Sequence, residues 1–183
     1  MNTATTLGLT SLIVASLAAF TGTGRPAPLS VPGASSFVGE LHGDLHESPR
    51  GTAKFGAVEA GAGTTMFTLS LGADGTEGSV LFTRTNGARL MPGTCAVSGR
   101  DDGSDELRAL IMTGTATHPT GVFRGQAGHL IITSATDNLI RGRFQVEAVG
   151  FLASDPADET RPMKATGIFT ATRQIAGNPS RAD

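Results

Sequence analysis

Apolar and polar residues alternate along most of the chain after its first 36 residues. Alternation with a period of two is typical of β-strands that bury one face. Gly, Asn, Asp and Pro interrupt the alternating runs at short intervals, and the Asn-Gly pair at 86–87 is typical of a tight hairpin turn. The pattern therefore predicts an all-β domain over residues 37–173.

Nine strands are expected in this domain: 37–46, 51–59, 64–72, 78–85, 94–99, 106–113, 121–134, 139–153 and 163–173. The connections are short, so strands that follow one another in sequence should pair antiparallel. The hairpin within 129–151 has the strongest alternation on both arms. Eight or nine strands at this spacing predict a single antiparallel β-sandwich, with a closed up-and-down β-barrel as the alternative.

A short motif, Gly-x-Phe, occurs in three of these strands, at 121–123, 142–144 and 167–169. Residues two apart in a strand face the same side, so each Gly leaves room for a ring on a neighbouring strand. The motif predicts core architecture. The alternative is that Phe123, Phe144 and Phe169 line a cavity for a small apolar ligand, as in a lipocalin-like barrel.

The N-terminal segment differs from the rest. Residues 7–20 are apolar, uncharged and shorter than the roughly 20 residues of a membrane span. They predict a signal peptide over 1–20, cleaved after Ala18, and export to the periplasm or the exterior. No Lys or Arg precedes the apolar run, so an uncleaved anchor is the alternative. Residues 21–36 are expected to be a flexible linker and 174–183 a disordered tail.

The chain contains one cysteine, Cys95. It does not follow the apolar run, so no lipid anchor is expected there, and one cysteine cannot form an internal disulfide. We expect Cys95 to be a small buried hydrophobe rather than a nucleophile.

The net charge and the aromatic content make some classes of binding partner improbable. The formal net charge of −2 gives no basic face for nucleic acid. The nine Phe lie in apolar alternation and there is no Trp or Tyr, which disfavours surfaces that stack sugars or bases.

The stretch ELHGDLHE, residues 40–47, gathers the most potential metal ligands and proton carriers. As one extended strand it would place Glu40, His42, Asp44 and His46 on one face, with His42 and His46 about 13–14 Å apart. That separation is too large for one ion with bonds near 2 Å. A metal site would need Asp44 with one adjacent histidine and further ligands, so a solvated face is the favoured interpretation of His42, Asp44 and His46.

Motifs of catalysis are missing from the sequence: it has no G-x-S-x-G, no P-loop, no HExxH and no CxxC. No catalytic residue and no cofactor is therefore expected. Asp155, Asp158 and Glu159 lie in an acidic stretch that is expected to be solvated, with a weak cation site as the alternative. Arg141 and Arg143 should point outward in a cross-strand charge ladder, with a small anion-binding patch that includes Arg124 as the alternative.

The segments GELHGDL, GTAKFG, FTLSLG, VLFTRTNG, PGTCAVS and GHLIITSATDNLIRGRFQVEAVGF, followed by ATGIFTATR, occur in this order. Together they resemble a family of exported bacterial all-β domains of unknown function. The resemblance covers nearly all of 37–173 and implies a domain of the cell envelope, but no active site. Cys95 departs from the family pattern, which often has an aromatic residue at that place.

The sequence thus predicts a non-enzymatic binding or accessory module of the bacterial envelope, whose partner is an envelope protein or a small apolar ligand. It predicts neither nucleic-acid binding nor stable membrane insertion after signal cleavage. One alternative is a barrel that carries a small apolar ligand. A weaker one is a metal-dependent enzyme that uses His42, Asp44 and His46.

Overall fold

The computed structural model describes residues 35–59, 64–72, 78–85, 89–100, 106–115, 118–156 and 159–174. These residues form strands and turns, and none of them belongs to a helix long and apolar enough to cross a membrane. The strands are β1 (Ser36–His42), β2 (His46–Glu47), β3 (Arg50–Gly51), β4 (Ala53–Glu59), β5 (Thr65–Leu71), β6 (Ser79–Arg84), β7 (Gly93–Ser98), β8 (Arg108–Gly114), β9 (Pro119–Ala135), β10 (Leu139–Leu152) and β11 (Arg161–Arg173).

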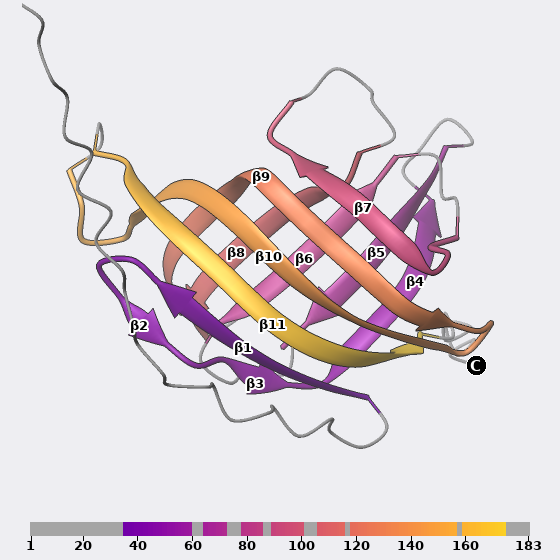
Figure 1. The fold of residues 1–183 in the computed structure, drawn as a ribbon. Coiled ribbons are helices and arrows are strands. Elements are labelled where there is room, and N and C mark those ends of the chain that lie inside the picture. The colour runs from indigo at the N-terminus through magenta and orange to yellow at the C-terminus, as the bar shows by residue number, and fades with distance from the viewer. Residues whose placement is uncertain are drawn as a thin grey trace, which may run out of the picture.

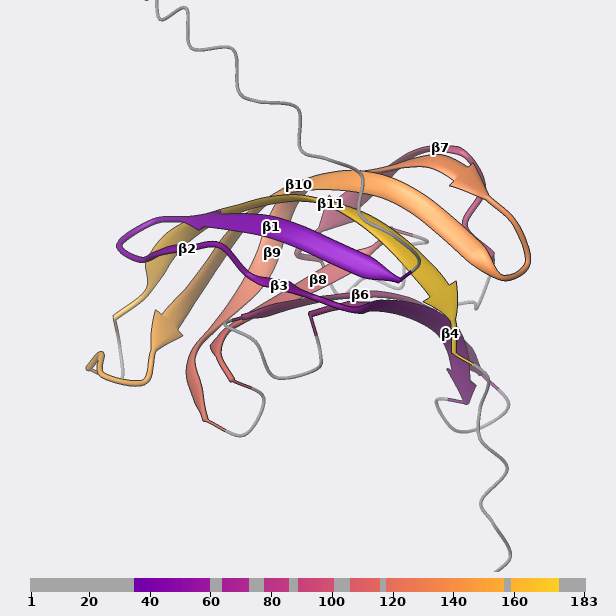
Figure 2. The same ribbon diagram turned by 90° about the horizontal axis from the view of Figure 1, so that it is seen from below.

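The strands join in the order β10-β9-β8-β6-β5-β4-β11-β1-β2, and β10 also pairs with β11. Nearly all pairs are antiparallel; the contact between β11 and β4 is parallel and two residues long. Seen from below, the strands lie in two layers, with β1, β11 and β10 in one and β6 and β4 in the other (Figure 2). We call these the front and back layers. The strands of the two layers cross in Figure 1.

Strand β9 belongs to both layers because it bends in the middle. Its first half pairs with β8 and its second half with β7. The bend lies at Gln126, which the pairing with β10 skips, and is followed by Gly128 with a φ of 140°. A Cβ at Gly128 would lie 2.2 Å from the Gln145 carbonyl oxygen, so only glycine fits. The expectation that sequential strands pair is wrong for β7, which pairs with β9 instead of β6.

The core lies between the layers and depends on the Gly-x-Phe motifs. Gly142 lies opposite Phe169 and Phe144 lies opposite Gly167 in the β10–β11 pairing. A Cβ at Gly167 would come within 2.8 Å of the Phe144 ring, and one at Gly142 within 2.9 Å of the Phe169 ring. Each glycine therefore makes room for the ring across from it. The interpretation of the motif as core architecture is confirmed.

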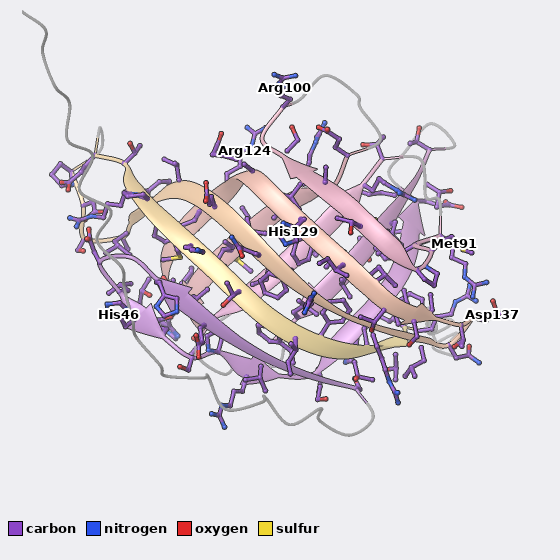
Figure 3. All side chains as sticks on the ribbon, viewed as in Figure 1. His46, Met91, Arg100, Arg124, His129 and Asp137 are labelled. Atoms are coloured by element: carbon purple, nitrogen blue, oxygen red, sulfur yellow. The ribbon has the colours of Figure 1, made fainter. Side chains whose placement is uncertain are left out.

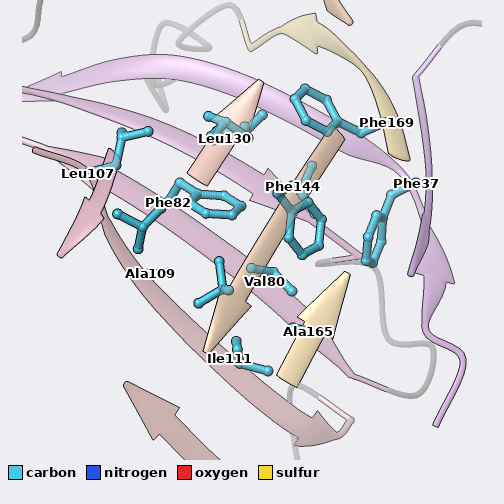
Figure 4. Packing of buried hydrophobic residues seen from close by; sticks show 14 of the residues in the cluster. Phe37, Val80, Phe82, Leu107, Ala109, Ile111, Leu130, Phe144, Ala165 and Phe169 are labelled. Atoms are coloured by element: carbon cyan, nitrogen blue, oxygen red, sulfur yellow. The ribbon is translucent and has the colours of Figure 1, made fainter. Parts of the chain in front are cut away.

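Phe144 stands at the centre of this packing (Figure 4). Its ring centroid lies 6.1 Å from that of Phe37 on β1 and 5.3 Å from that of Phe82 on β6, so it joins the two layers. Such offset and edge-on ring pairs add to the stabilisation that comes from burial alone.

The predicted all-β, sandwich-like fold of antiparallel strands is confirmed. Nine strands were expected and the described residues form eleven, because 37–46 divides into β1 and β2 and 51–59 divides into β3 and β4. The signal peptide predicted over 1–20, residues 21–34 of the linker and residues 175–183 of the tail lie outside the described residues.

Candidate functional site

The stretch ELHGDLHE forms a hairpin, so the prediction of a single strand through His46 is wrong. Strand β1 ends at His42, the chain turns over 43–45, and β2 begins at His46. His42 and His46 lie opposite each other with ring centroids 5.6 Å apart, nearly perpendicular at 70°. The predicted separation of about 13–14 Å does not exist. The pair Gly43-Asp44 was the missed signal, because Gly-Asp between two short strands favours a turn.

The turn also fits tightly against the beginning of β11. A Cβ at Gly43 would lie 2.8 Å from the Pro162 carbonyl oxygen, closer than real contacts allow. Leu45, which alternation placed with Leu41 on the buried face, is only half-buried in the turn, whereas Leu41 is 1% exposed.

The polar groups of this hairpin separate into two sets. His42 Nε2 and the Glu40 carboxylate form a hydrogen bond of 3.2 Å, and both side chains are half exposed. Asp44 points elsewhere, to Arg161. Within the described ranges, no group of three or more His, Cys, Asp or Glu side chains is placed to hold a metal ion. The hairpin thus brings His42 and His46 together but leaves Asp44 in a different contact.

Arg161, at the start of β11, is surrounded by three carboxylates. Its Nε donates to Asp155 Oδ2 at 2.9 Å, and its Nη2 lies 2.8 Å from Asp155 Oδ1 and 2.9 Å from Glu159 Oε1. Asp44 accepts from Nη1. We call these four residues the Arg161 cluster; it ties the β1–β2 turn to the segment before β11. Asp158 lies outside the described residues.

Asp155 is the buried member of the Arg161 cluster, with 3% of its side chain exposed. The hydrogen bond from Arg161 lowers the pKa of Asp155, and a second one from the Leu152 amide lowers it further. The same contacts, with Asp155 first and Asp44 second, raise the pKa of Arg161. Asp155 and Glu159 therefore bind the Arg161 guanidinium. These two carboxylates were two of the three ligands considered for a weak cation site, and both are already occupied by Arg161.

Among the described residues, two hollows lie on the outer face of the front layer. The first, the hairpin hollow, has a volume of about 400 Å³ and is lined by His42, Gly43, Gln126, Glu147, Ala148, Val149, Pro162, Met163 and Lys164. Across its floor, His42 lies opposite Lys164 and Lys164 lies opposite Glu147, so the row from β1 to β10 places one cationic side chain next to one anionic side chain. Val149 and Phe151, which are 39% and 53% exposed, extend β10 at the same end.

The second hollow, the central hollow, has a volume of about 380 Å³ and lies beside the first. Its polar lining comes from His129, Arg143, Gln145 and Thr166, and its apolar lining includes Ile131 and Ile168. His129 lies near the middle of the front layer in Figure 3. As expected, Arg143 points outward from β10. Sequence reasoning did not place His129 here, because its position depends on the bend of β9.

The three phenylalanines considered as ligand contacts lie in the packed core. Phe123 is 1% exposed, and Phe144 and Phe169 are each 3% exposed. Their rings contact glycines and other rings on neighbouring strands, and Phe144 also borders the central hollow from below. A ligand among these rings stays a prediction. Cys95 is half-buried and packs against the same core.

No protein-family model matches the chain, and no curated protein or solved structure matches it.

Proposed function

We propose that this chain is an exported, non-enzymatic binding module of the bacterial cell envelope, and that it binds a partner protein through the outer face of its front layer. The observation that carries the proposal is the pair of adjacent hollows on this face, of about 400 and 380 Å³. Interaction sites on proteins combine concave shape, exposed apolar groups and a few polar groups that fix orientation.

The chemistry of this face suits a protein partner. Val149 and Phe151 supply exposed apolar area beside the hairpin hollow. Lys164 and Glu147 lie opposite each other next to them, so a partner with matched charges would be selected over others. Because β9, β10 and β11 are long and paired along most of their lengths, the face is rigid and little entropy is lost on binding.

Photo-crosslinking in the producing cell tests this proposal. A photoreactive residue is placed at Gln145 or Lys164 on the front face, and at Ser70 as a matched control. Ser70 is half-buried on β5, between the inward Leu69 and Leu71, and so faces outward on the back layer. Adducts with one partner from both front positions and none from Ser70 would support the proposal. No adduct from the front face, or the same adduct from Ser70, would contradict it.

Export and the lack of enzymatic activity are tested separately. We expect the protein in the periplasmic or extracellular fraction, with a mature N-terminus at residue 19. A full-length chain in the cytoplasm would contradict export. Turnover by the purified protein that disappears on substitution of His42 or His46 would contradict a non-enzymatic role.

A further inference from the structure

A third pocket lies at the other end of the molecule. Its volume is about 200 Å³, and its lining comes from β4, β5, the segment before β7, the β9–β10 turn and the end of β11. Figure 3 shows Asp137, from its rim, at the opposite end of the front layer from His46. We call it the Arg173 pocket. It is separate from the two hollows of the front face.

The floor of the Arg173 pocket is aromatic. The rings of Phe55 and Phe67 stack with centroids 6.4 Å apart and planes inclined by 29°, and they are 8% and 4% exposed. Ala57 lies two residues beyond Phe55, on the same side of β4, but is exposed and forms part of the wall. The edge of the core is therefore an apolar surface at the bottom of the pocket. A flat aromatic group or a short alkyl chain of a ligand can pack against it.

The rim of the pocket is cationic. It contains Arg89, Asp137 and Arg173. Arg89 and Asp137 form an ion pair, so their charges offset each other. Within the described part of the chain, no carboxylate pairs with the Arg173 guanidinium, which leaves a net charge of about +1 above the aromatic floor. A guanidinium offers two parallel N–H donors that match a carboxylate.

We propose that the Arg173 pocket binds a small carboxylic acid, with its apolar body against Phe55 and Phe67 and its carboxylate on Arg173. The volume of about 200 Å³ is below the roughly 300–1,000 Å³ of pockets for drug-sized ligands. The occupant is therefore about the size of benzoate or a short fatty acid. This inference does not depend on the front-face proposal, and either can fail alone.

Three aromatic molecules of similar size test the charge requirement: benzoate, benzyl alcohol and benzylamine. Each is titrated into the isotopically labelled full chain while backbone amide shifts are recorded. Benzoate should bind with a dissociation constant on the order of 1 mM, as expected for so small a ligand. It should move the amides of Phe55, Ala57, Phe67 and Arg173, and bind at least about fivefold more tightly than benzylamine.

Two variants and a control localise the site. Arg173→Gln should weaken the binding of benzoate about three- to tenfold and leave the binding of benzyl alcohol unchanged. Ala57→Leu should fill the pocket and abolish the amide shifts caused by each of the three ligands. The rest of its spectrum should show an intact fold. Arg141→Gln, on the exposed outer side of β10, should change nothing. Equal binding of benzoate and benzylamine, no benzoate binding, or benzoate binding that survives both pocket variants would overturn the proposal.

Discussion

An arginine stands at each end of β11, and the two have opposite surroundings. Arg161, at the start, contacts three carboxylates, and one of them, Asp155, is almost fully buried. Arg173, at the end, lies on the rim of an aromatic pocket. An arginine whose three nitrogens all contact carboxylates of the protein stabilises the fold. One whose donors are left over at an apolar pocket is suited to a ligand.

A substitution in the middle of β11 should lower the stability of the whole strand, and we expect the largest loss of unfolding free energy there. Gly167→Ala would bring a Cβ within 2.8 Å of both the Phe144 ring and the Val38 carbonyl oxygen. Overpacking of this kind costs about 1–3 kcal/mol. Urea unfolding measures the loss. Gly56→Ala is the matched control, because its Cβ would have only Gln174 nearby, at 3.8 Å. Equal stability of the two variants would contradict the described core.

Arg161→Gln should lower Tm by several degrees, because it leaves the buried Asp155 carboxylate without its main partner. Arg173→Gln should leave Tm within about a degree of the wild type, since no ion pair is lost within the described residues. Thermal unfolding of the two variants side by side measures the contrast. An equal loss of Tm at both positions would remove the distinction between the two ends.

Acid should weaken the Arg161 end. The pKa of Asp155 is lower in the folded chain than its ordinary value of 3.8. Asp155 therefore contributes stability above about pH 4, and this contribution is lost as pH falls through the folded pKa. The stability difference between wild type and Asp155→Asn should be constant from pH 7 to about 5 and shrink below that. A stability difference between the two proteins that does not change with pH down to about 2 would contradict the ion pair between Asp155 and Arg161.

The smallest effect is expected at Asp44, which is 59% exposed. Asp44→Asn removes one carboxylate from Arg161 but leaves Asp155 and Glu159 in place, so Tm should fall by only about 1–3 °C. The amide shifts of the turn over 43–45 should change more than those of the strands. A loss as large as that of Arg161→Gln would mean that the hairpin contact, rather than Asp155, holds the cluster together.

Alternation along the chain was enough to predict the strands, because each buries one face and its period does not depend on neighbours. The Gly-x-Phe motifs were interpreted correctly for the same reason: Gly142 and Phe144 share a face whatever strand lies beside them. What alternation could not supply was the partner of each strand. The pairing of β7 with β9 depends on the bend at Gln126, which involves residues distant in sequence.

The candidate sites were harder to predict. The histidine stretch was interpreted as a strand because Leu41 and Leu45 continue its alternation, whereas Gly43-Asp44 turns the chain. The Arg161 cluster joins Asp44 to a residue 117 positions away, and no local pattern indicates such a contact. The Arg173 pocket combines five segments in the same way.

The contrast between Arg161 and Arg173 is tested most directly by NMR of the guanidinium Nε–H groups in one sample, with and without benzoate. The Arg161 Nε–H, which donates to Asp155, should exchange slowly with water and keep its shift when benzoate is added. The Arg173 Nε–H should exchange rapidly and shift as benzoate binds. Equal exchange rates at the two arginines, or a benzoate-induced shift at Arg161 instead of Arg173, would contradict the account.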